Sequence, residues 1–359
     1  MSSDGVFTGS TATSQPHIPV MLMEVLSRLG PEDDETYIDA TFGAGGYTSA
    51  ILDAADCKVL ALDRDPSAVK AGFDLALAYD GRLSLMQLPF SILDRYTADP
   101  DPDWETTYVA QYDGVVFDLG VSSMQLDQDA RGFSFQVDGP LDMRMFHDGG
   151  ATPPLEGGPT AADIVNTADA ALLADIIFQL GEEKRSRRIA EAIVARRSEK
   201  PFERTLDLAD VVEKVLGGRR GDARHPATKT FQALRMYVND ELGELVRGLA
   251  GAERCLKPGG RLVVVTFHSL EDRIVKRFMA KRSGKDGGVS RHMPVQIESE
   301  NRPSLKIVNH PPLTSSKGEL DVNPRARSAR LRSAVRTDAA PWPFDASDLG
   351  VPAIVRSTL

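Results

Sequence analysis

Short apolar runs alternate with amphipathic segments along the first 130 residues. The apolar runs predict strands near residues 37–40, 58–62, 83–86 and 113–117, and the amphipathic segments predict helices near 20–28, 46–53 and 66–78. Alternation of this kind is typical of a parallel sheet with crossover helices. Ligands of such sheets bind at the carboxyl ends of the strands. We therefore expect Asp39, Asp63 and Asp118, which end three of the runs, to border a binding site.

The alternation stops after Asp118. Residues 119–160 are rich in Gly, Pro, Asp and Met and show no period, whereas residues 160–216 are helical in pattern. Leucines and isoleucines at 172–180 fall on one helix face, with Asp169 as its N-cap. A second helix is expected at 182–198 with an exposed basic face, and Thr205 is expected to cap a third. This pattern predicts a helical domain inserted between the fourth and fifth strands.

The α/β pattern then resumes. One long amphipathic helix is predicted over residues 231–249, ended by Lys257-Pro-Gly-Gly260, and a buried strand follows at 261–267. Runs at 304–308 and 328–335 complete the sheet. We predict a doubly wound, Rossmann-like α/β domain at 17–135 and 225–337, the helical insertion at 136–224, a disordered tail at 1–16 and a loosely packed extension at 338–359.

The turn after the first strand is the first candidate for chemistry. Residues 37–46 read Tyr-Ile-Asp-Ala-Thr-Phe-Gly-Ala-Gly-Gly, and Asp63, which ends the second strand, stands where a ribose would be held. A dinucleotide fingerprint needs a third glycine where this chain has Thr48, and it has no use for an acid at Asp39. An acid there suits the cationic amino-acid end of S-adenosylmethionine (SAM). The turn favours SAM over NAD, and a simple packing turn is the third interpretation.

Three other strand ends carry candidate residues. Phe90 follows the third strand, where it would lie against an adenine or belong to the core. Asp118 stands where methylases of exocyclic base amines carry an acid or amide, although the two prolines that usually follow are absent. His268 follows the fifth strand as a catalytic group or a structural hydrogen-bonding group. Arg235 and Asn239 share one helix face and either contact substrate or, as we favour, solvent.

The distribution of charge along the chain indicates a nucleic-acid partner. The 359 residues carry a net charge of −10, but residues 184–336 hold 33 Lys and Arg against 18 Asp and Glu, leaving 9 against 34 elsewhere. A segregated basic half is what an RNA-facing surface needs, although solvated helix faces also explain charge runs. Cys57 and Cys255 are far apart, which indicates reduced thiols and no zinc site. With no signal peptide or membrane-length run, we expect a cytoplasmic protein.

Eight blocks together resemble one family. They are His17-Ile-Pro-Val-Met-Leu, Asp39-Ala-Thr-Phe-Gly-Ala-Gly-Gly46, Leu62-Asp-Arg-Asp-Pro66, Asp118-Leu-Gly-Val-Ser-Ser, Arg131-Gly-Phe-Ser-Phe, Gly139-Pro-Leu-Asp-Met-Arg-Met, Phe267-His-Ser-Leu-Glu-Asp-Arg and Asn323-Pro-Arg-Ala-Arg-Ser-Ala-Arg-Leu-Arg332. The set, over residues 17–336, resembles the bacterial methyltransferases that modify the N4 amine of a decoding-centre cytidine in 16S ribosomal RNA.

The resemblance implies a SAM-dependent methyltransferase fold, 16S rRNA as partner and a set of donor contacts. Those contacts fall on Gly45, Gly46, Tyr47, Asp63, Phe90, Asp118 and Gln125. Tyr47 stands where many relatives have His, and Met124 where many have Pro, which weakens the assignments beside them.

Methyl transfer chiefly requires alignment of donor and acceptor, so a metal is not expected. Candidates for polarising the amine or accepting its proton are Asp118, Asp142, Asn239 and His268. Two other functions stay open on the residues alone: an NAD-dependent oxidoreductase and a non-catalytic RNA-binding ribosome assembly factor.

Overall fold

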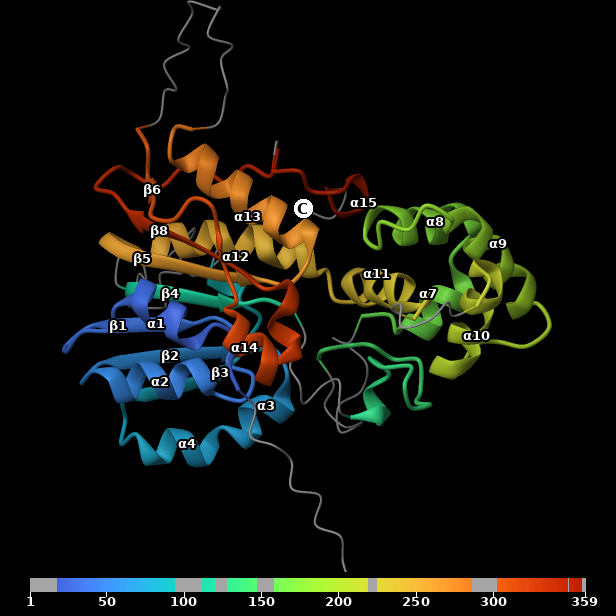
Figure 1. Cartoon of the computed structure of the whole chain (residues 1–359), viewed down its shortest axis with the longest axis horizontal. Coiled ribbons are helices and arrows are strands. Elements are labelled where there is room, and N and C mark those ends of the chain that lie inside the picture. Colours follow the sequence, from blue (N-terminus) through green and yellow to red (C-terminus); the bar gives the residue numbers. More distant parts are fainter. Residues whose placement is uncertain are drawn as a thin grey trace, which may run out of the picture.

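One mixed sheet organises the molecule. The computed structural model describes residues 18–93, 112–120, 128–146, 158–218, 225–285, 302–347 and 349–356. Within these ranges the strand order is β3-β2-β1-β4-β5-β8-β6, and β7 pairs with β8 (Figure 1). The strands are β1 (Thr36–Asp39), β2 (Lys58–Asp63), β3 (Leu83–Gln87), β4 (Tyr112–Asp118), β5 (Leu256–Thr266), β6 (Leu305–Ile307), β7 (Leu313–Thr314) and β8 (Arg330–Arg336).

The first five strands of this order are parallel, and β8 runs antiparallel to β5. Chain order reverses between β1 and β4, so the carboxyl ends of these two strands mark the switch point where ligands bind in such sheets. The predicted doubly wound α/β fold is confirmed.

Helices cover both faces of the sheet, and a separate group stands beside it (Figure 1). They are α1 (Leu22–Leu29), α2 (Gly46–Ala54), α3 (Pro66–Ala71), α4 (Phe73–Ala78), α7 (Ala161–Thr167), α8 (Ala170–Gln179), α9 (Ser186–Arg197), α10 (Thr205–Leu216), α11 (Thr228–Val238), α12 (Glu241–Cys255), α13 (Ser269–Arg282), α14 (Lys317–Val322) and α15 (Ala353–Arg356). In the described ranges, no helix combines the length and the apolarity that crossing a bilayer would need.

The central strands are buried on both sides, and their side chains alternate between two cores. Val116 of β4 and Val263 of β5 pack in the core that includes residues of α1 and α2. Their neighbours Val115 and Val264 pack in the core that includes residues of α12 and α13. Because both faces need apolar cover, these strands read in the sequence as continuous apolar runs.

The helical group beside the sheet comprises α7–α10, packed against α11. Asp169 caps α8 as predicted, its side chain accepting the N–H of Leu172 at 2.7 Å. The predicted capping role of Thr205 is wrong. Thr205 is the first residue of α10, and its buried hydroxyl accepts the N–H of Gly139 at 3.0 Å instead. This bond connects α10 to the segment that precedes α7.

The long helix predicted at 231–249 is two helices. α11 ends at Val238 and α12 begins at Glu241, because Asp240 adopts a left-handed backbone (φ 46°). The helix predicted at 66–78 is likewise divided into α3 and α4 at Gly72. Asn and Asp are the residue types that tolerate a left-handed helix end, so Asn239-Asp240 was a readable stop signal.

The described residues after Asp338, 339–347 and 349–356, are not loosely packed, contrary to our expectation. Leu349, Val351 and Val355 are buried in the core shared with α12 and α13. The N–H of Trp342 donates to Glu253 Oε1 at 3.1 Å, and Glu253 is paired with the buried Arg282 at 3.1 Å. A buried ion pair placed beneath the segment thus holds its backbone in position.

Candidate functional site

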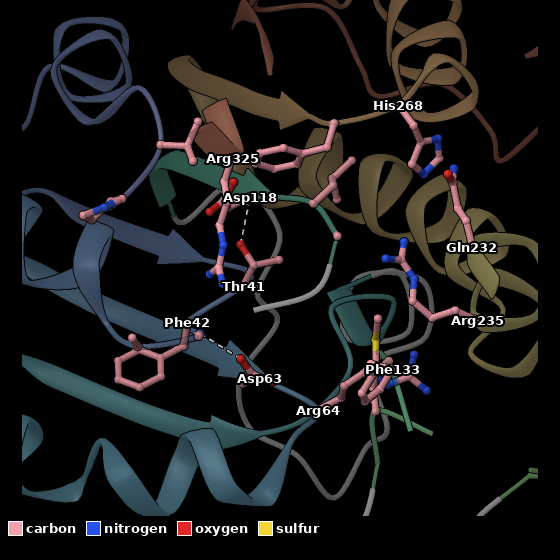
Figure 2. Close-up of a pocket in the computed structure, with 18 of the residues that line it drawn as sticks. Thr41, Phe42, Asp63, Arg64, Asp118, Phe133, Gln232, Arg235, His268 and Arg325 are labelled. Atoms are coloured by element: carbon pink, nitrogen blue, oxygen red, sulfur yellow. Dashed lines mark hydrogen bonds between the residues drawn. The ribbon is translucent and has the colours of Figure 1, made fainter. Parts of the chain in front are cut away.

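A cavity of about 560 Å³ opens at the carboxyl ends of the parallel strands (Figure 2). We call one side the strand-end wall; it includes Thr41, Gly43, Asp63, Phe90 and Asp118. We call the other side the opposite wall; it includes Phe133, Phe135, Phe231, Gln232 and Arg235. The strand-end wall comes from the sheet, whereas the opposite wall comes from α11 and the segment 128–146.

Asp63 is held at the end of β2 by backbone groups. Its Oδ2 accepts the N–H of Gly43 at 2.8 Å (Figure 2). Its Oδ1 accepts the N–H of Asp65, also at 2.8 Å. Burial raises the pKa of Asp63 to about 6. The side chain lines the cavity, as its predicted role at a ribose requires.

The glycine turn is shaped by protein contacts. Gly45 has φ 78°, and a Cβ there would meet Phe42 at 2.9 Å and Leu75 at 2.8 Å; this residue does not line the cavity. Gly46 and Tyr47 do line it. A Cβ on Gly46 would stand 2.3 Å from Pro19 Cγ, so this glycine lets the N-terminal segment lie on the turn.

Asp39 does not face the cavity, so our expectation that it binds the cationic end of SAM is wrong. The side chain is fully buried; its Oδ1 accepts the N–H of Thr41 at 3.1 Å and its Oδ2 accepts the hydroxyl of Thr48 at 2.7 Å. Burial raises its pKa to about 6. Thr48, at the position where a third glycine was sought, is thus the partner of this acid.

Asp118, like Asp63, lines the cavity. Its backbone N–H donates to Thr41 Oγ1 at 2.7 Å (Figure 2), but its buried Oδ1 has no hydrogen-bond partner among the described residues. Burial, and then the charges of Asp39 and Glu271, raise its pKa well above the ordinary value. A buried, unsatisfied carboxylate oxygen beside a cavity is a group that a ligand can satisfy.

Phe90 belongs to the core and is also placed where a ligand could contact it. Its ring packs edge-on against Phe117, with centroids 5.4 Å apart, and it also lines the cavity. Gln125, the remaining predicted donor contact, lies outside the described residues.

His268 lines the cavity as the N-cap of α13. Its Nδ1 accepts the N–H of Glu271 at 3.4 Å, and its Nε2 lies 2.9 Å from Glu271 Oε1. Burial would raise the pKa of Glu271, but contacts with His268 and the N–H of Phe267 lower it overall. His268 therefore has a structural role as the cap of α13, but its buried Nε2 makes no hydrogen bond among the described residues, so its role toward the substrate stays a prediction.

Asp142 and Asn239 are not among the residues that line the cavity. Asp142 binds the Arg144 guanidinium through both oxygens, at 2.8 and 2.7 Å. Asn239 is buried; its Oδ1 accepts the N–H of Met145 at 2.7 Å and its Nδ2 donates to Met143 O at 2.8 Å. The two side chains fix the shape of the segment 139–145, and a direct role toward the substrate stays a prediction.

Arg235 is not solvated, contrary to our preference. It lines the cavity and donates to both carboxylate oxygens of Glu241, at 2.7 and 2.8 Å. Glu241, His268 and Glu271 have ligand atoms within 4.8 Å of one another, a spacing compatible with a metal ion. Arg235 already supplies the positive charge at Glu241, so this cluster is balanced by protein groups.

A buried brace connects the two walls, and the sequence did not reveal it. Arg131 Nη1 lies 2.9 Å from Asp65 Oδ2, with exposed side-chain fractions of 5% and 2%. Arg131 Nη2 donates to the carbonyls of Arg144 and Met145, at 3.1 and 2.8 Å. Asp65 in turn donates its N–H to Asp63. The Arg131–Asp65 brace therefore joins the end of β2 to the segment that carries the opposite wall.

Comparison with known proteins assigns the chain to a family. Residues 14–337 match the MraW methylase family. A "Ribosomal RNA small subunit methyltransferase H" of Parvibaculum lavamentivorans is 53% identical over 342 residues, covering 95% of this chain and 96% of that protein. Its namesake from Hyphomonas neptunium is 54% identical over 332 residues, covering 92% of each. A solved structure described as a putative rRNA-methylase from Clostridium thermocellum aligns with 89% of this chain and 99% of its own, at 12% identity and a TM-score of 0.37.

Membership in a methylase family excludes the two other functions that the residues alone left open, an NAD-dependent oxidoreductase and a non-catalytic assembly factor. The chain belongs to the MraW methylase family and is a methyltransferase that uses SAM.

Proposed function

We propose that the protein methylates the N4 amine of a cytidine in the decoding centre of 16S rRNA, within the small ribosomal subunit. The relatives named above carry the small-subunit rRNA assignment in their names. The observation that carries the finer proposal is Asp118. Its Oδ1, without a hydrogen-bond partner among the described residues, stands at the end of β4 beside the cavity, where it would accept an amine N–H.

The strand-end wall supplies what the methyl donor needs. Asp63 accepts the ribose hydroxyls, the Phe90 ring lies against the adenine, and Gly46 and Tyr47 border the amino-acid end. The volume of about 560 Å³ is in the range of small-molecule sites. Gly45 contributes to this site by shaping the turn, and Gln125 is retained as a donor contact from the resemblance.

The donor, when bound, supplies a methyl group attached to a sulfonium sulfur. Once the methyl group is transferred, this sulfur is left as a neutral thioether. The protein's part is alignment and proton handling. A cytosine amine is a weak nucleophile because its lone pair is delocalised into the ring, and a hydrogen bond from its N–H to Asp118 favours attack. The raised pKa of Asp118 makes this carboxylate a better base, so it can accept the proton that leaves the nitrogen.

RNA reaches the site from the side of the helical group. The target base must be unpaired or extruded to enter the cavity. Near the start of α9, side chains that can meet backbone phosphates are exposed; they are Lys184, Arg185, Arg187 and Arg188. Arg197, near the end of α9, donates to the carbonyls of Val165 and Ala168 and so binds within the helical group. We propose residues 136–224 as the RNA-binding insertion and 17–135 with 225–337 as the donor-binding domain.

The test is mass-spectrometric mapping of 16S rRNA from a strain lacking the gene, with and without a plasmid copy. We expect N4-methylcytidine to disappear from the decoding centre and to return with the wild-type copy. Purified protein should also transfer labelled methyl groups to small subunits from the deletion strain. Unchanged N4-methylcytidine in the deletion strain would refute the site assignment, and methylation of another base would redirect it.

A further inference from the structure

We propose that Arg235 binds the O2 carbonyl of the target cytosine through Nη1 and thereby selects cytosine over adenine. The proposal rests on the function above and deepens it, because it assigns recognition of the base to a residue of the opposite wall. Contact with the substrate is also one of the two interpretations that the sequence alone left open for Arg235.

The ion pair with Glu241 holds the Arg235 guanidinium in place but uses only two of its three nitrogens. Nε and Nη2 donate to the two carboxylate oxygens of Glu241, at 2.7 and 2.8 Å. Nη1 makes no hydrogen bond among the described residues, and it is not one of the buried atoms that lack a partner, so it is accessible. Because Arg235 lines the cavity, the two protons of Nη1 can be donated to a ligand there.

The break between α11 and α12 makes this ion pair possible. Arg235 and Glu241 are six residues apart, a spacing that places two residues on different faces of a continuous helix. The left-handed backbone of Asp240 turns the chain, so that Glu241 at the start of α12 meets Arg235 in the last turn of α11. The exposed fractions of the two side chains are 15% and 10%. Arg235 is therefore a largely desolvated donor of fixed direction, from which a hydrogen bond is strong.

A donor placed across the cavity from Asp118 distinguishes the bases that carry an exocyclic amine beside an accepting ring nitrogen. Cytosine and adenine both have this pair of groups. The next group along the same edge is the O2 carbonyl in cytosine and a C–H in adenine. Figure 2 shows Arg235 and Gln232 on the side of the cavity across from Asp118. With the amine held at Asp118, Nη1 would meet an acceptor on cytosine and none on adenine.

Helix α11 presents the other groups that a base needs. Phe231, Gln232 and Arg235 all line the cavity, and residues three and four apart lie on one face of a helix. The Phe231 ring packs against Phe135, with centroids 4.7 Å apart, and can stack on the base while the polar side chains meet its edge. Because Glu241 already neutralises the guanidinium, Nη1 suits a neutral carbonyl better than a phosphate, whose binding depends on uncompensated charge.

The experiment changes the donor and the acceptor separately. Small subunits are reconstituted with 16S rRNA that carries either cytidine or 2-thiocytidine at the target position; the sulfur of 2-thiocytidine is a weak acceptor. The value of kcat/KM for labelled-methyl transfer is measured for the wild type and for Arg235→Lys, which keeps a charge opposite Glu241 but has one ammonium in place of three nitrogens. Arg247→Lys is the matched control, because Arg247 pairs with Asp240 and Glu244 and does not line the cavity.

We expect the sulfur to lower kcat/KM about tenfold for the wild type and for Arg247→Lys. Arg235→Lys should lose about tenfold on cytidine and less than about a further twofold on 2-thiocytidine, because the hydrogen bond is already lost. Its affinity for S-adenosylhomocysteine, measured by calorimetry, should equal that of the wild type. A purely structural role of Arg235 would lower kcat/KM on both substrates by the same factor.

A tenfold effect of the sulfur that persists in Arg235→Lys would overturn the proposal, because the guanidinium would then not act on O2. Wild-type activity of Arg235→Lys on cytidine would overturn it as well. Weaker binding of S-adenosylhomocysteine by Arg235→Lys would overturn it in favour of a contact with the methyl donor. The rRNA target is judged by its own mapping experiment on the wild-type gene, so the two proposals fail separately.

Discussion

The two walls of the cavity are built in different ways. On the strand-end wall, Asp63 and Asp118 each follow a buried strand, and backbone N–H groups of the next loop hold Asp63. On the opposite wall, Phe133 and Gln232 come from a short loop and a helix that no strand positions. Side-chain bonds across long sequence separations, through Arg131 and Asn239, hold that wall instead.

This difference separates what each wall can do. A wall fixed by the sheet suits a cofactor that is the same in every turnover. A wall held by a few side-chain bonds can be adapted to a substrate without disturbing the sheet. We therefore expect changes on the strand-end wall to affect donor binding or chemistry, and changes on the opposite wall to affect RNA binding.

The largest predicted effect is a loss of stability when the Arg131–Asp65 brace between the two walls is removed. Arg131→Met leaves Asp65 as a buried charge without its guanidinium, which typically costs about 3–5 kcal/mol of unfolding free energy. Urea unfolding followed by circular dichroism measures this loss. The double variant Arg131→Met with Asp65→Asn should recover part of it, because the uncompensated charge is removed. Strictly additive losses in the double variant would show that the two side chains do not act as a pair.

The next largest effect should come from the strand-end wall. Asp118→Ala should lower kcat by about 100-fold or more at saturating donor and small subunits, the range for a lost group that stabilises a transition state. Labelled-methyl transfer measures it. Asp113→Asn is the control on the same strand, since Asp113 pairs with Lys257 away from the cavity. A rate within about threefold of the wild type for Asp118→Ala would remove Asp118 from the chemistry.

Beneath the same wall, Asp39 should show a pH-dependent effect on stability. Its pKa is raised from 3.8 to about 6, so the native state holds a proton that the unfolded state releases, and stability falls as pH rises from about 4 to 6. Asp39→Asn removes this loss; its Oδ1 can still accept the N–H of Thr41, and its Nδ2 can donate to the Thr48 hydroxyl, which donates to the acid in the wild type. At about pH 8 it should stabilise the protein by roughly 3 kcal/mol, and at about pH 4 by little. A stability difference that does not change with pH would contradict the raised pKa.

The sequence predicted the strand-end wall better than the opposite wall for a physical reason. Strand ends, glycine turns and acids that end strands are local patterns, so the positions of Asp63 and Asp118 were predictable, and the doubly wound α/β fold followed from the alternation. The partner of Arg131 is 66 residues away and that of Asn239 is 94 residues away, and no local pattern encodes such pairs. Asp39 shows a different limit of local patterns. Its position at the end of β1 was predictable, but the direction of its side chain, toward Thr48 and not toward the ligand, was not.

The smallest effect we predict tests the opposite wall. The Gln232 amide lines the cavity. Its hydrogen-bond partner among the described residues is Met236 Sδ, at 3.8 Å. An amide offers an acceptor for a cytosine amine N–H and a donor for the ring nitrogen N3. Gln232→Ala should therefore raise the KM for small subunits about three- to tenfold, with kcat and S-adenosylhomocysteine affinity nearly unchanged. Gln232→Glu keeps the acceptor but loses the donor, so it should be no better than alanine. If Gln232→Ala instead weakened the donor and left the KM for RNA unchanged, the division of labour between the walls would be wrong.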